Sequence, residues 1–578
     1  MTASLDPIAR VPRDRNRNSW WCRVILEELV AGGLSHVVLC PGGRSSAMAM
    51  SLATNPAITT LVQTDERSAA FVALGLAKSL GRPVAVCTTS GSAVANLVPA
   101  LLEAFHSSLP LILLTCDRPR AQRHSGAPQT ADHIGLCRTS VQFSVDLDEP
   151  KAELPALRTL RQHLAEVRRQ SALGPVHLNI PLPGVLSSMD PDPEWRDAPP
   201  CEDSCAKECH SGDTLPADET AFPSWIPDRP GLRGLIVAAS DSLLKGDQVG
   251  RLADLTGFPL LADAPSGYRR PRCSANLVTE ADLLTSTPAF VTPPADIIIR
   301  LGLAPISHGL HRYLALQPCP TLKIEARTEA SDFLSRNSSS LVHPSPATLD
   351  ALIRRLGKGD PEWLRLWLDT GAKLRERVEN HLDKCDWNEC QAARMICNAP
   401  GFDFLHLANS MSVRHGNMFC RPTDRPQRIF ANRGVNGIDG TLGTFFGELI
   451  GTGSRGLLLI GDLAFLHDLP ALEAAKHAGL NGTICLMDNS GGALFDLLGC
   501  DAIPDFDRFM RNPQAADFSG IARAFGIPAR TCANRSELAA ALEQSAGHSG
   551  IALIHVRIPG HSLKRDILDL VAACFATA

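Results

Sequence analysis

The chain has 578 residues, too many for one hydrophobic core, because cores stop growing at about 250 to 300 residues and longer chains divide into domains. Hydrophobic residues make up 44% and charged residues 20%, a balance that excludes a disordered or fibrous protein. The net charge is −5 and no long basic run is present, so we expect no nucleic-acid partner. About three domains are expected from this length.

The N-terminal segment 1–19 carries several arginines and lacks the apolar centre of a secretion signal, so we expect a disordered leader. The 18 cysteines are scattered along the chain, and without a secretion signal most are expected to be reduced thiols in the core. No run of about 18 apolar residues is present, so no membrane insertion is expected. These features predict a cytoplasmic protein.

Residues 20–190 alternate short β-rich runs with segments of helical period, which predicts a parallel, doubly wound α/β domain. The expected strands are continuous apolar runs, as in sheets covered on both faces, at 36–40, 58–62, 83–88, 111–116 and 176–180. Residues 191–232 are rich in Pro, Asp, Glu and Ser and are interpreted as a linker.

Two further α/β domains are expected, at 233–356 and 401–578, joined by a helical segment at 357–400. The central domain has expected strands at 235–239, 259–262, 296–301 and 321–326, and the last domain at 428–431, 456–460, 483–487 and 551–556. Its last helix is expected to begin at Asn534, with Glu537 completing a capping pair. The predicted fold class is therefore α/β, with three doubly wound parallel sheets and ligands at the carboxyl ends of strands.

The segment 461–492 offers a candidate metal site. One expected strand ends at Asp462 and the next at Asn489, so a carboxylate and an amide reach one edge of the sheet. With the carbonyl of Gly491 they form an oxygen-only set suited to Mg²⁺, and the glycines offer N–H groups to a phosphate. The alternative is that Asp, Asn and Gly are common turn residues at strand ends in any α/β fold.

Glu66 follows an expected strand and precedes an apolar helix. The pair Gly461-Asp462, followed about 27 residues later by Asn489, resembles the thiamine-diphosphate motif. The resemblance implies a carboxyl group against the aminopyrimidine ring of that cofactor, and Glu66 is the candidate for that role. The alternative is an acid favoured at a helix start by the helix dipole.

Several motifs together resemble a known family. They are PGGRSSAM, TDERSAAFVALGLAK, TSGSAVANLVPALLEA, LLTCDRP, NSMSVR, NRGVNGIDG, GDLAFLHDL and DNSGGALF. In order and spacing they are similar to the MenD family, the thiamine-diphosphate-dependent synthases of menaquinone biosynthesis. The resemblance implies decarboxylation of 2-oxoglutarate and addition of the resulting succinyl-semialdehyde carbanion to isochorismate, giving 2-succinyl-5-enolpyruvyl-6-hydroxy-3-cyclohexene-1-carboxylate. It covers the first and third domains well and the central domain poorly.

The resemblance also implies thiamine diphosphate with Mg²⁺ or Mn²⁺ as cofactors, in an active site built across the interface of a homodimer or of a dimer of dimers. Glu66 matches the cofactor-activating glutamate, and Asp462, Asn489 and Gly491 match the metal ligands. The remaining matches to cofactor-binding positions are Ile438, Gly461, Gly492, Leu494 and Phe495.

Substrate-binding positions carry over in the same way. Ser410, Arg414 and Arg433 match groups that hold the donor carboxylates. Arg44, Arg118 and Gln129 match groups around the acceptor, with Arg44 and Gln129 counted as catalytic beside Glu66. Both substrates are dicarboxylic acids, which guanidinium groups bind through paired hydrogen bonds. For any single arginine the alternative is a surface ion pair.

Two departures from the family pattern lie on the acceptor side. The third residue of the usual Pro-Gly-Ser-Arg-Ser is Gly43 here, and a Lys-Arg pair of the central domain aligns with His308 and Gly309. His308, His311 or Arg312 could replace it as a substrate-binding group. We therefore expect weaker isochorismate binding or another acceptor, and we keep two alternatives: a related 2-oxo acid decarboxylase or carboligase, and an inactive family member that acts as a binding protein.

The segment CEDSCAKECH contains four candidate soft metal ligands, Cys201, Cys205, Cys209 and His210. Its spacing differs from the usual Cys-x₂-Cys knuckle and it lies in the polar linker, which favours incidental cysteines over a Zn²⁺ site.

Overall fold

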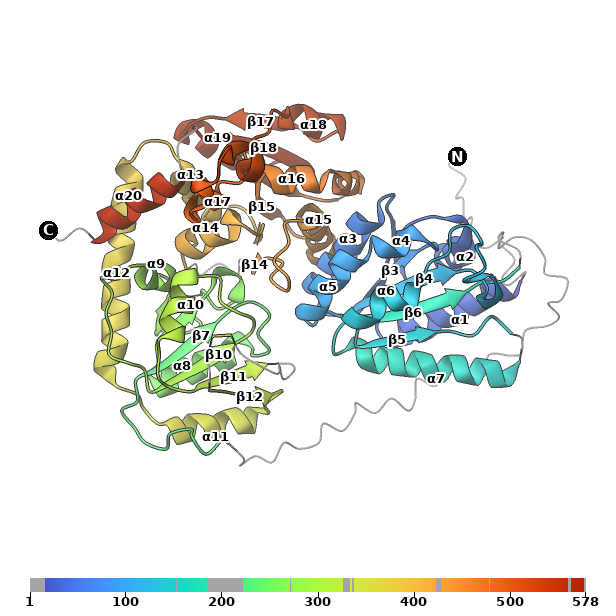
Figure 1. The fold of residues 1–578 in the computed structure, drawn as a ribbon, viewed down its shortest axis with the longest axis horizontal. Coiled ribbons are helices and arrows are strands. Elements are labelled where there is room, and N and C mark those ends of the chain that lie inside the picture. The colour runs from blue at the N-terminus through green and yellow to red at the C-terminus, as the bar shows by residue number, and fades with distance from the viewer. Residues whose placement is uncertain are drawn as a thin grey trace, which may run out of the picture. The chain divides into compact units, whose positions relative to one another are not determined.

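The computed structural model describes residues 16–151, 153–184, 222–270, 272–325, 333–334, 337–422, 428–477, 479–559 and 563–575 (Figure 1). These residues belong to two compact units. The first consists of the chain up to Asp213 together with Asp439–Gly453 and Asp468–His477, and the second contains the rest. The C-terminal part of the chain therefore passes back and forth between the units.

The first unit is built on a parallel sheet with the strand order β2-β1-β3-β4-β6-β5. Its strands are β1 (His36–Leu39), β2 (Thr59–Val62), β3 (Val84–Thr88), β4 (Leu111–Asp117), β5 (Phe143–Asp146) and β6 (Val176–Pro181). Its helices are α1 (Arg17–Ala31), α2 (Ser46–Ala53), α3 (Glu66–Leu80), α4 (Ser92–Ala95), α5 (Val98–His106), α6 (His133–Cys137), α7 (Leu154–Ser171), α15 (Thr441–Thr452) and the 3₁₀ segments η2 (Gly43–Ser45), η3 (Arg120–Gln122), η4 (Arg138–Ser140) and η7 (Leu469–Lys476).

Five of the six strands of this sheet match the runs expected from the sequence, and the edge strand β5 does not. Strands β3, β4 and β6 are buried along their whole length, whereas β5 is half-buried, which explains its weaker apolar signal. Helix α1 begins at Arg17, where Asn16 caps it by accepting a hydrogen bond from the Ser19 N–H at 3.0 Å. Residues 17–19, expected in a disordered leader, are thus the first turn of a helix.

Helices α3 and α15 pack unusually closely (Figure 1). A Cβ atom added to Gly75 would lie 2.1 Å from the Thr444 carbonyl oxygen, and one added to Gly447 would lie 2.1 Å from the Val72 carbonyl oxygen. Only glycine allows the two backbones this approach. At the start of α15, the buried Asp468 carboxylate accepts hydrogen bonds from the backbone N–H groups of three residues: Gly440, Leu442 and Gly443.

The central sheet of the second unit is parallel, with the order β12-β11-β10-β7-β8-β9. Renumbered from its first strand this is 6-5-4-1-2-3, the arrangement typical of doubly wound dinucleotide-binding sheets. Its strands are β7 (Gly234–Ala238), β8 (Leu260–Ala262), β9 (Leu277–Val278), β10 (Ile297–Leu301), β11 (Thr321–Glu325) and β12 (Ser338–Val342). Its helices are α8 (Gly246–Thr256), α9 (Ala281–Ser286), α10 (His308–Ala315), α11 (Pro346–Leu356) and the short η6 (Ala264–Ser266).

The third sheet is also parallel, with the order β14-β13-β15-β16-β18-β17. Counted from its first strand, this order is identical to that of the first sheet. Its strands are β13 (Phe404–Leu407), β14 (Arg428–Phe430), β15 (Gly456–Gly461), β16 (Gly482–Asp488), β17 (Ala529–Cys532) and β18 (Ile551–Arg557). Its helices are α14 (Met411–Phe419), α16 (Asp462–His467), α17 (Leu494–Leu497), α18 (Phe518–Ala524), α19 (Arg535–Ala546), α20 (Leu563–Phe575) and the turns η8 (Cys500–Ala502) and η9 (Asp507–Arg511).

Asn534 is the N-cap of α19 and accepts a hydrogen bond from the Glu537 N–H at 3.0 Å, as the sequence predicts. The expectation that this is the last helix is wrong, because α20 follows β18. The predicted connecting segment contains α12 (Pro361–Lys384) and α13 (Glu389–Cys397).

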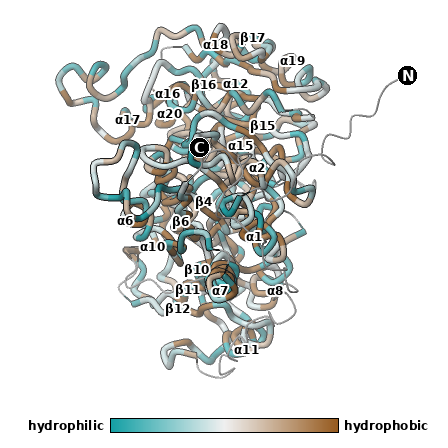
Figure 2. The backbone as a smooth tube through the Cα atoms, turned by 90° about the vertical axis from the view of Figure 1, so that its right-hand side faces the viewer, coloured by the Kyte–Doolittle hydropathy of each residue, from teal (hydrophilic) through white to brown (hydrophobic). Residues whose placement is uncertain are grey.

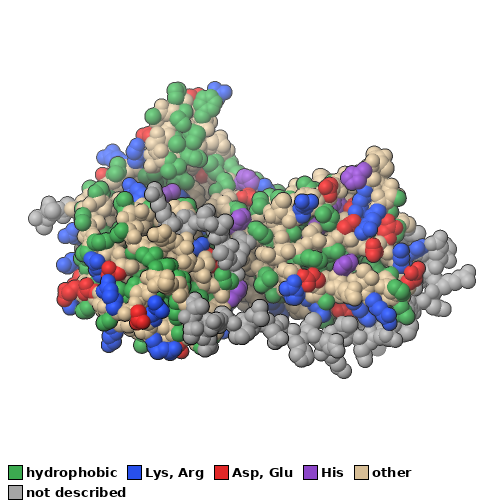
Figure 3. Space-filling model, turned by 60° about the horizontal axis from the view of Figure 1, so that its bottom comes forward, with side chains coloured by type: hydrophobic (Ala, Val, Ile, Leu, Met, Phe, Trp, Pro, Cys, Tyr) green, Lys and Arg blue, Asp and Glu red, His purple; other side chains and the backbone are tan. Residues whose placement is uncertain are grey.

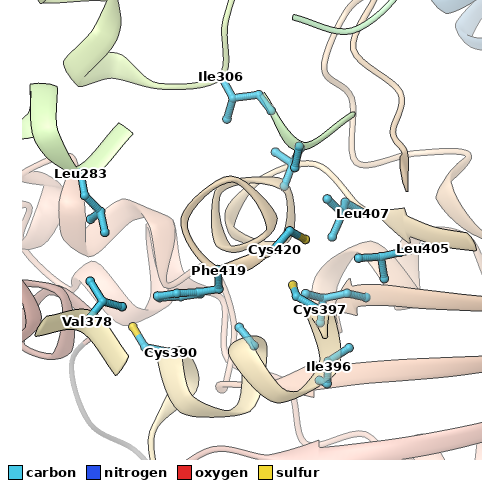
Figure 4. Packing of buried hydrophobic residues seen from close by; sticks show 14 of the residues in the cluster. Leu283, Ile306, Val378, Cys390, Ile396, Cys397, Leu405, Leu407, Phe419 and Cys420 are labelled. Carbon is cyan, nitrogen blue, oxygen red and sulfur yellow. The ribbon is translucent and has the colours of Figure 1, made fainter. Parts of the chain in front are cut away.

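One core extends from the central sheet to the third sheet. Helices α13 and α14 contribute Ile396, Cys397 and Phe419 to this cluster, which also contains Cys420 and Leu407 of β13 (Figure 4). The linker predicted at 191–232 is described only from residue 222, and there Ile226 and Leu232 are buried in the core of the central sheet.

Hydrophobic and hydrophilic segments alternate along the backbone (Figure 2), and the face drawn in Figure 3 mixes basic and acidic side chains. All the cysteines that the structure describes are free thiols and most are buried, as expected for reduced core cysteines. Within the described residues no helix is long and apolar enough to cross a membrane.

Candidate functional site

A pocket lies at the carboxyl ends of β15 and β16. The two strands are parallel neighbours, so Asp462 after β15 and Asn489 after β16 reach the same edge, as predicted. The pocket brings together all the residues expected to bind the cofactor except Glu66: Ile438, Gly461, Asp462, Asn489, Gly491, Gly492, Leu494 and Phe495. Ser410, expected to bind the donor substrate, also lines it. Arg414 and Arg433 do not line it.

Asp462 is 2% exposed, and its carboxylate accepts hydrogen bonds from the N–H groups of Gly491 at 2.7 Å and Leu463 at 2.8 Å. Burial raises the pKa of this carboxyl to about 6, and Asp488 nearby adds to the shift while the two N–H groups oppose it. A divalent cation at this carboxylate would offset the cost of its buried charge. The donor set therefore fits a hard cation such as Mg²⁺.

The described residues contain no group of three His, Cys, Asp or Glu side chains that could hold a metal ion. A cation in this pocket would need the Asn489 amide oxygen, a backbone carbonyl and ligands from a bound molecule in addition to Asp462. Mg²⁺ bound beside a diphosphate has this kind of mixed coordination.

The turn after β16 requires glycine at position 491. Gly491 has φ +111°, and a Cβ there would lie 2.2 Å from the Arg511 carbonyl oxygen. Gly492 donates its N–H to the same carbonyl at 2.7 Å, and Arg511 pairs with Asp496 at 2.6 Å. The segment η9 thus lies directly against the glycine turn of the pocket.

Glu389, at the start of α13, also lines this pocket and was not predicted as a site residue. It is 3% exposed and accepts a hydrogen bond from Asn489 Nδ2 at 2.8 Å. Burial raises the pKa of the Glu389 carboxyl to about 7, with the hydrogen bond from Asn489 opposing the shift and nearby carboxylates, Asp462 among them, adding to it. Its only sequence signal is an acid in the first turn of a helix.

Ser410 and Arg414 lie at the start of α14. Ser410 has φ +67° and ψ −127°, a strained conformation for a residue with a side chain, and its carbonyl accepts a 2.6 Å hydrogen bond from Arg414 Nη1. Burial lowers the pKa of the Arg414 guanidinium, an effect that the Asp282 carboxylate partly offsets.

Asn409 organises the loop that carries Arg433 and Ile438. Its Oδ1 accepts from Arg433 Nη1 at 2.7 Å, and its Nδ2 donates to the carbonyls of Asn432 at 2.7 Å and Gly437 at 2.6 Å. It is 3% exposed and precedes Ser410 in the NSMSVR motif, but it was not predicted as a site residue.

In the first unit, Glu66 is the first residue of α3 and accepts a hydrogen bond from Asn96 Nδ2 at 3.1 Å. The preceding Asp65 caps the helix by accepting from the Ser68 N–H at 2.7 Å. Asp65 therefore caps the helix, so the Glu66 carboxylate is not needed as the cap.

Arg44, Arg118 and Gln129 lie near the carboxyl edge of the first sheet. The backbone N–H of Arg44 donates to Thr89 Oγ1 at 3.3 Å, and Gln129 Nε2 donates to the Ser90 carbonyl at 3.1 Å, so both are held by the loop after β3. Arg118 follows β4, the next strand. Burial lowers the pKa of the Arg44 guanidinium, and repulsion from Arg118 lowers it further.

His133 also holds the loop after β3, and it was not predicted as a site residue. Its Nε2 accepts the Gly91 N–H at 3.1 Å, and its Nδ1 lies 2.9 Å from Asn179 Oδ1, so the buried ring has its proton on Nδ1.

His308 is the exposed first residue of α10, whose N-cap is Ser307. Gly309 is buried, and a Cβ there would lie 2.4 Å from Ser286 Oγ and 2.7 Å from the Ser286 backbone nitrogen. An arginine at position 309 therefore has no room. Of the two positions that align with the family's Lys-Arg pair, only His308 can contribute a side chain to substrate binding. Cys201, Cys205, Cys209 and His210 lie outside the described residues.

Comparison with known protein families identifies the class of enzyme to which the chain belongs. Residues 21–136 match the family described as thiamine pyrophosphate enzyme, N-terminal TPP binding domain, and residues 398–556 match the corresponding C-terminal TPP binding domain. The chain is thus a thiamine diphosphate enzyme with both cofactor-binding domains.

Its relatives narrow the class. The chain is 35% identical to the 2-succinyl-5-enolpyruvyl-6-hydroxy-3-cyclohexene-1-carboxylate synthase of Synechococcus sp. (strain JA-3-3Ab), over 92% of each chain. It is 32% identical to the synthase of the same name from Halobacterium salinarum, over 95% of this chain and 97% of that one, and 32% identical to that of Roseiflexus sp. (strain RS-1), over 94% and 95%. The chain belongs to this family of synthases.

Proposed function

We propose that the protein joins 2-oxoglutarate to isochorismate, with loss of carbon dioxide, to form 2-succinyl-5-enolpyruvyl-6-hydroxy-3-cyclohexene-1-carboxylate in menaquinone biosynthesis. Its family membership supports the reaction. The observation that carries the proposal is the pocket in which Asp462, Asn489 and Gly491 meet at the ends of two neighbouring strands.

In that pocket Asp462, Asn489 and the Gly491 carbonyl would hold Mg²⁺ or Mn²⁺ against the diphosphate, and Gly492 with the start of α17 would face the phosphate oxygens. Bound thiamine diphosphate would supply the carbanion chemistry of decarboxylation and carbon–carbon bond formation. Ile438, Leu494 and Phe495 would pack against its apolar parts.

Glu66, held by Asn96, would bind the aminopyrimidine ring and exchange a proton with it. Ser410, Arg414 and Arg433 would bind the carboxylates of 2-oxoglutarate, because guanidinium groups pair with carboxylates through two parallel hydrogen bonds.

For the acceptor, Arg44, Arg118 and Gln129 would bind isochorismate and orient it. An anionic ligand between Arg44 and Arg118 would relieve the repulsion between the two guanidinium groups. His308, on helix α10 beside the central sheet, would add a further substrate-binding side chain. Because Gly43 and Gly309 lack the side chains found at these positions in the family, a related carboligase reaction with another acceptor is the second candidate.

The assembly is proposed to be a homodimer or a dimer of such dimers, acting in the cytoplasm. Light scattering on the purified protein tests the assembly: a monomer at micromolar concentration with cofactor and Mg²⁺ would contradict it.

The reaction is tested by incubating the protein with thiamine diphosphate, Mg²⁺, 2-oxoglutarate and isochorismate and identifying the product by mass. Glu66→Gln is expected to bind the cofactor and to lose about 10²- to 10⁴-fold in turnover, the usual contribution of a proton-transferring side chain. Carbon dioxide release without a ring adduct would favour the second candidate. No cofactor binding at all would favour an inactive family member that acts as a binding protein.

A further inference from the structure

Glu389 is a buried acid for which the proposed reaction has no use. It lies 100 positions before Asn489 in the sequence, in the segment between the central and third sheets, yet it lines the cofactor pocket. A carboxyl group is kept in such a place at a cost in free energy unless it has a fixed partner. Its partner is the side-chain amide of Asn489.

The direction of this hydrogen bond fixes the orientation of the amide. Asn489 Nδ2 donates to Glu389 Oε2 at 2.8 Å, so the amide oxygen Oδ1 points the other way. A divalent cation binds the oxygen of an amide and is repelled by its NH₂ group. Without an acceptor on this side, rotation by about 180° would present the wrong end, because both ends of an amide have nearly the same shape.

Glu389 is itself held rigidly. Helix α13 begins at this residue and is capped by Asn388, which accepts the Gln391 N–H at 2.9 Å. Cys390, Ile396 and other residues of the helix pack into the shared core (Figure 4). The second carboxylate oxygen, Oε1, lies 3.6 Å from Nε2 of the buried His415.

We propose that Glu389 is a positioning residue that turns the Asn489 amide so that its Oδ1 faces the divalent cation of the cofactor. The inference rests on the proposed function of this pocket. Groups that orient metal ligands typically contribute 10- to 100-fold to metal affinity, so the effect is large enough to measure.

The test is a titration with Mn²⁺ in the presence of thiamine diphosphate, followed by electron paramagnetic resonance of free Mn²⁺. Glu389→Ala is expected to weaken Mn²⁺ binding about 10- to 100-fold. Glu389→Gln, whose amide oxygen can still accept a hydrogen bond from Asn489, is expected to lose less Mn²⁺ affinity than Glu389→Ala. Gln391→Ala is the matched control, because Gln391 is 3% exposed on the same helix and bonds to the carbonyls of Leu382 and Cys385, away from the pocket.

A double-mutant cycle separates positioning from general stability. If Glu389 acts through Asn489, then Glu389→Ala, which weakens Mn²⁺ binding in the wild type, causes no further loss of Mn²⁺ affinity in protein that already carries Asn489→Ala. Equal Mn²⁺ affinity of the wild type and Glu389→Ala would overturn the inference, as would parallel losses in Glu389→Ala and Gln391→Ala. Failure of the wild type to bind Mn²⁺ and cofactor would instead refute the proposed function, and this inference with it.

Discussion

The close contact of α3 with α15 predicts an unusual response to a Gly-to-Ala change. At most helical positions this change is stabilising, by about 0.5 to 1 kcal/mol. At Gly447 the new Cβ would lie 2.1 Å from the Val72 carbonyl oxygen and 2.8 Å from the Leu76 nitrogen, and both atoms belong to the backbone of α3. The helices would have to separate, and overpacking of this kind costs about 1 to 3 kcal/mol.

We therefore expect Gly447→Ala to lower the melting temperature by about 2 to 12 °C, since each kcal/mol corresponds to about 2 to 4 °C in a unit of 150 to 250 residues. Because α3 begins at Glu66, a shift of about 1 Å is expected to reduce turnover about 10²-fold. Calorimetry and the product assay measure both effects. Gly246→Ala in α8, where a Cβ meets no atom within 4 Å, is the control and should be neutral or stabilising. A melting temperature of Gly447→Ala equal to that of the wild type would refute the packing argument.

Three further changes have defined outcomes. Burial lowers the pKa of His177 to about 3, so below pH 6.5 the unfolded chain takes up a proton at this residue that the folded chain does not. Acid therefore destabilises the fold. His177→Gln should reduce this loss of stability between pH 6 and 4 by up to about 1.4 kcal/mol per pH unit, as measured by urea titrations. Ser410→Gly should raise stability by about 1 kcal/mol by relieving its positive φ, while raising KM for 2-oxoglutarate; unchanged stability would exclude strain at this position. Gly309→Arg should destabilise by at least about 1 kcal/mol through its contact with Ser286, whereas His308→Lys at the exposed neighbouring position should not, as thermal denaturation can show.

The fold was largely predictable where strands are buried on both faces. The central strands β3, β4, β15 and β16 are continuous apolar runs, and the sequence located each of them to within a residue or two. Edge strands such as β12, with three consecutive serines, gave too weak a signal. In these positions pairing with a neighbouring strand, rather than local pattern, decides the structure.

The site was predictable where the chemistry lies at strand ends. Asp462 and Asn489 follow apolar runs directly, so their convergence could be inferred from the parallel topology alone. Glu389 and Asn409 could not be inferred, because their roles depend on hydrogen bonds to residues that distant parts of the chain bring near. The lack of space at Gly309 likewise depends on Ser286 of another helix.

The division of the chain between the two units limits how this protein can be taken apart. After residue 438 the chain changes unit four times, at 438–439, 453–454, 467–468 and 477–478. A fragment ending at residue 213 would lack α15 and η7, and would leave the glycine face of α3 uncovered. No single cut separates the units into complete pieces, so proteolytic nicking within 439–477 should damage both units together, and each is expected to depend on an intact chain for folding.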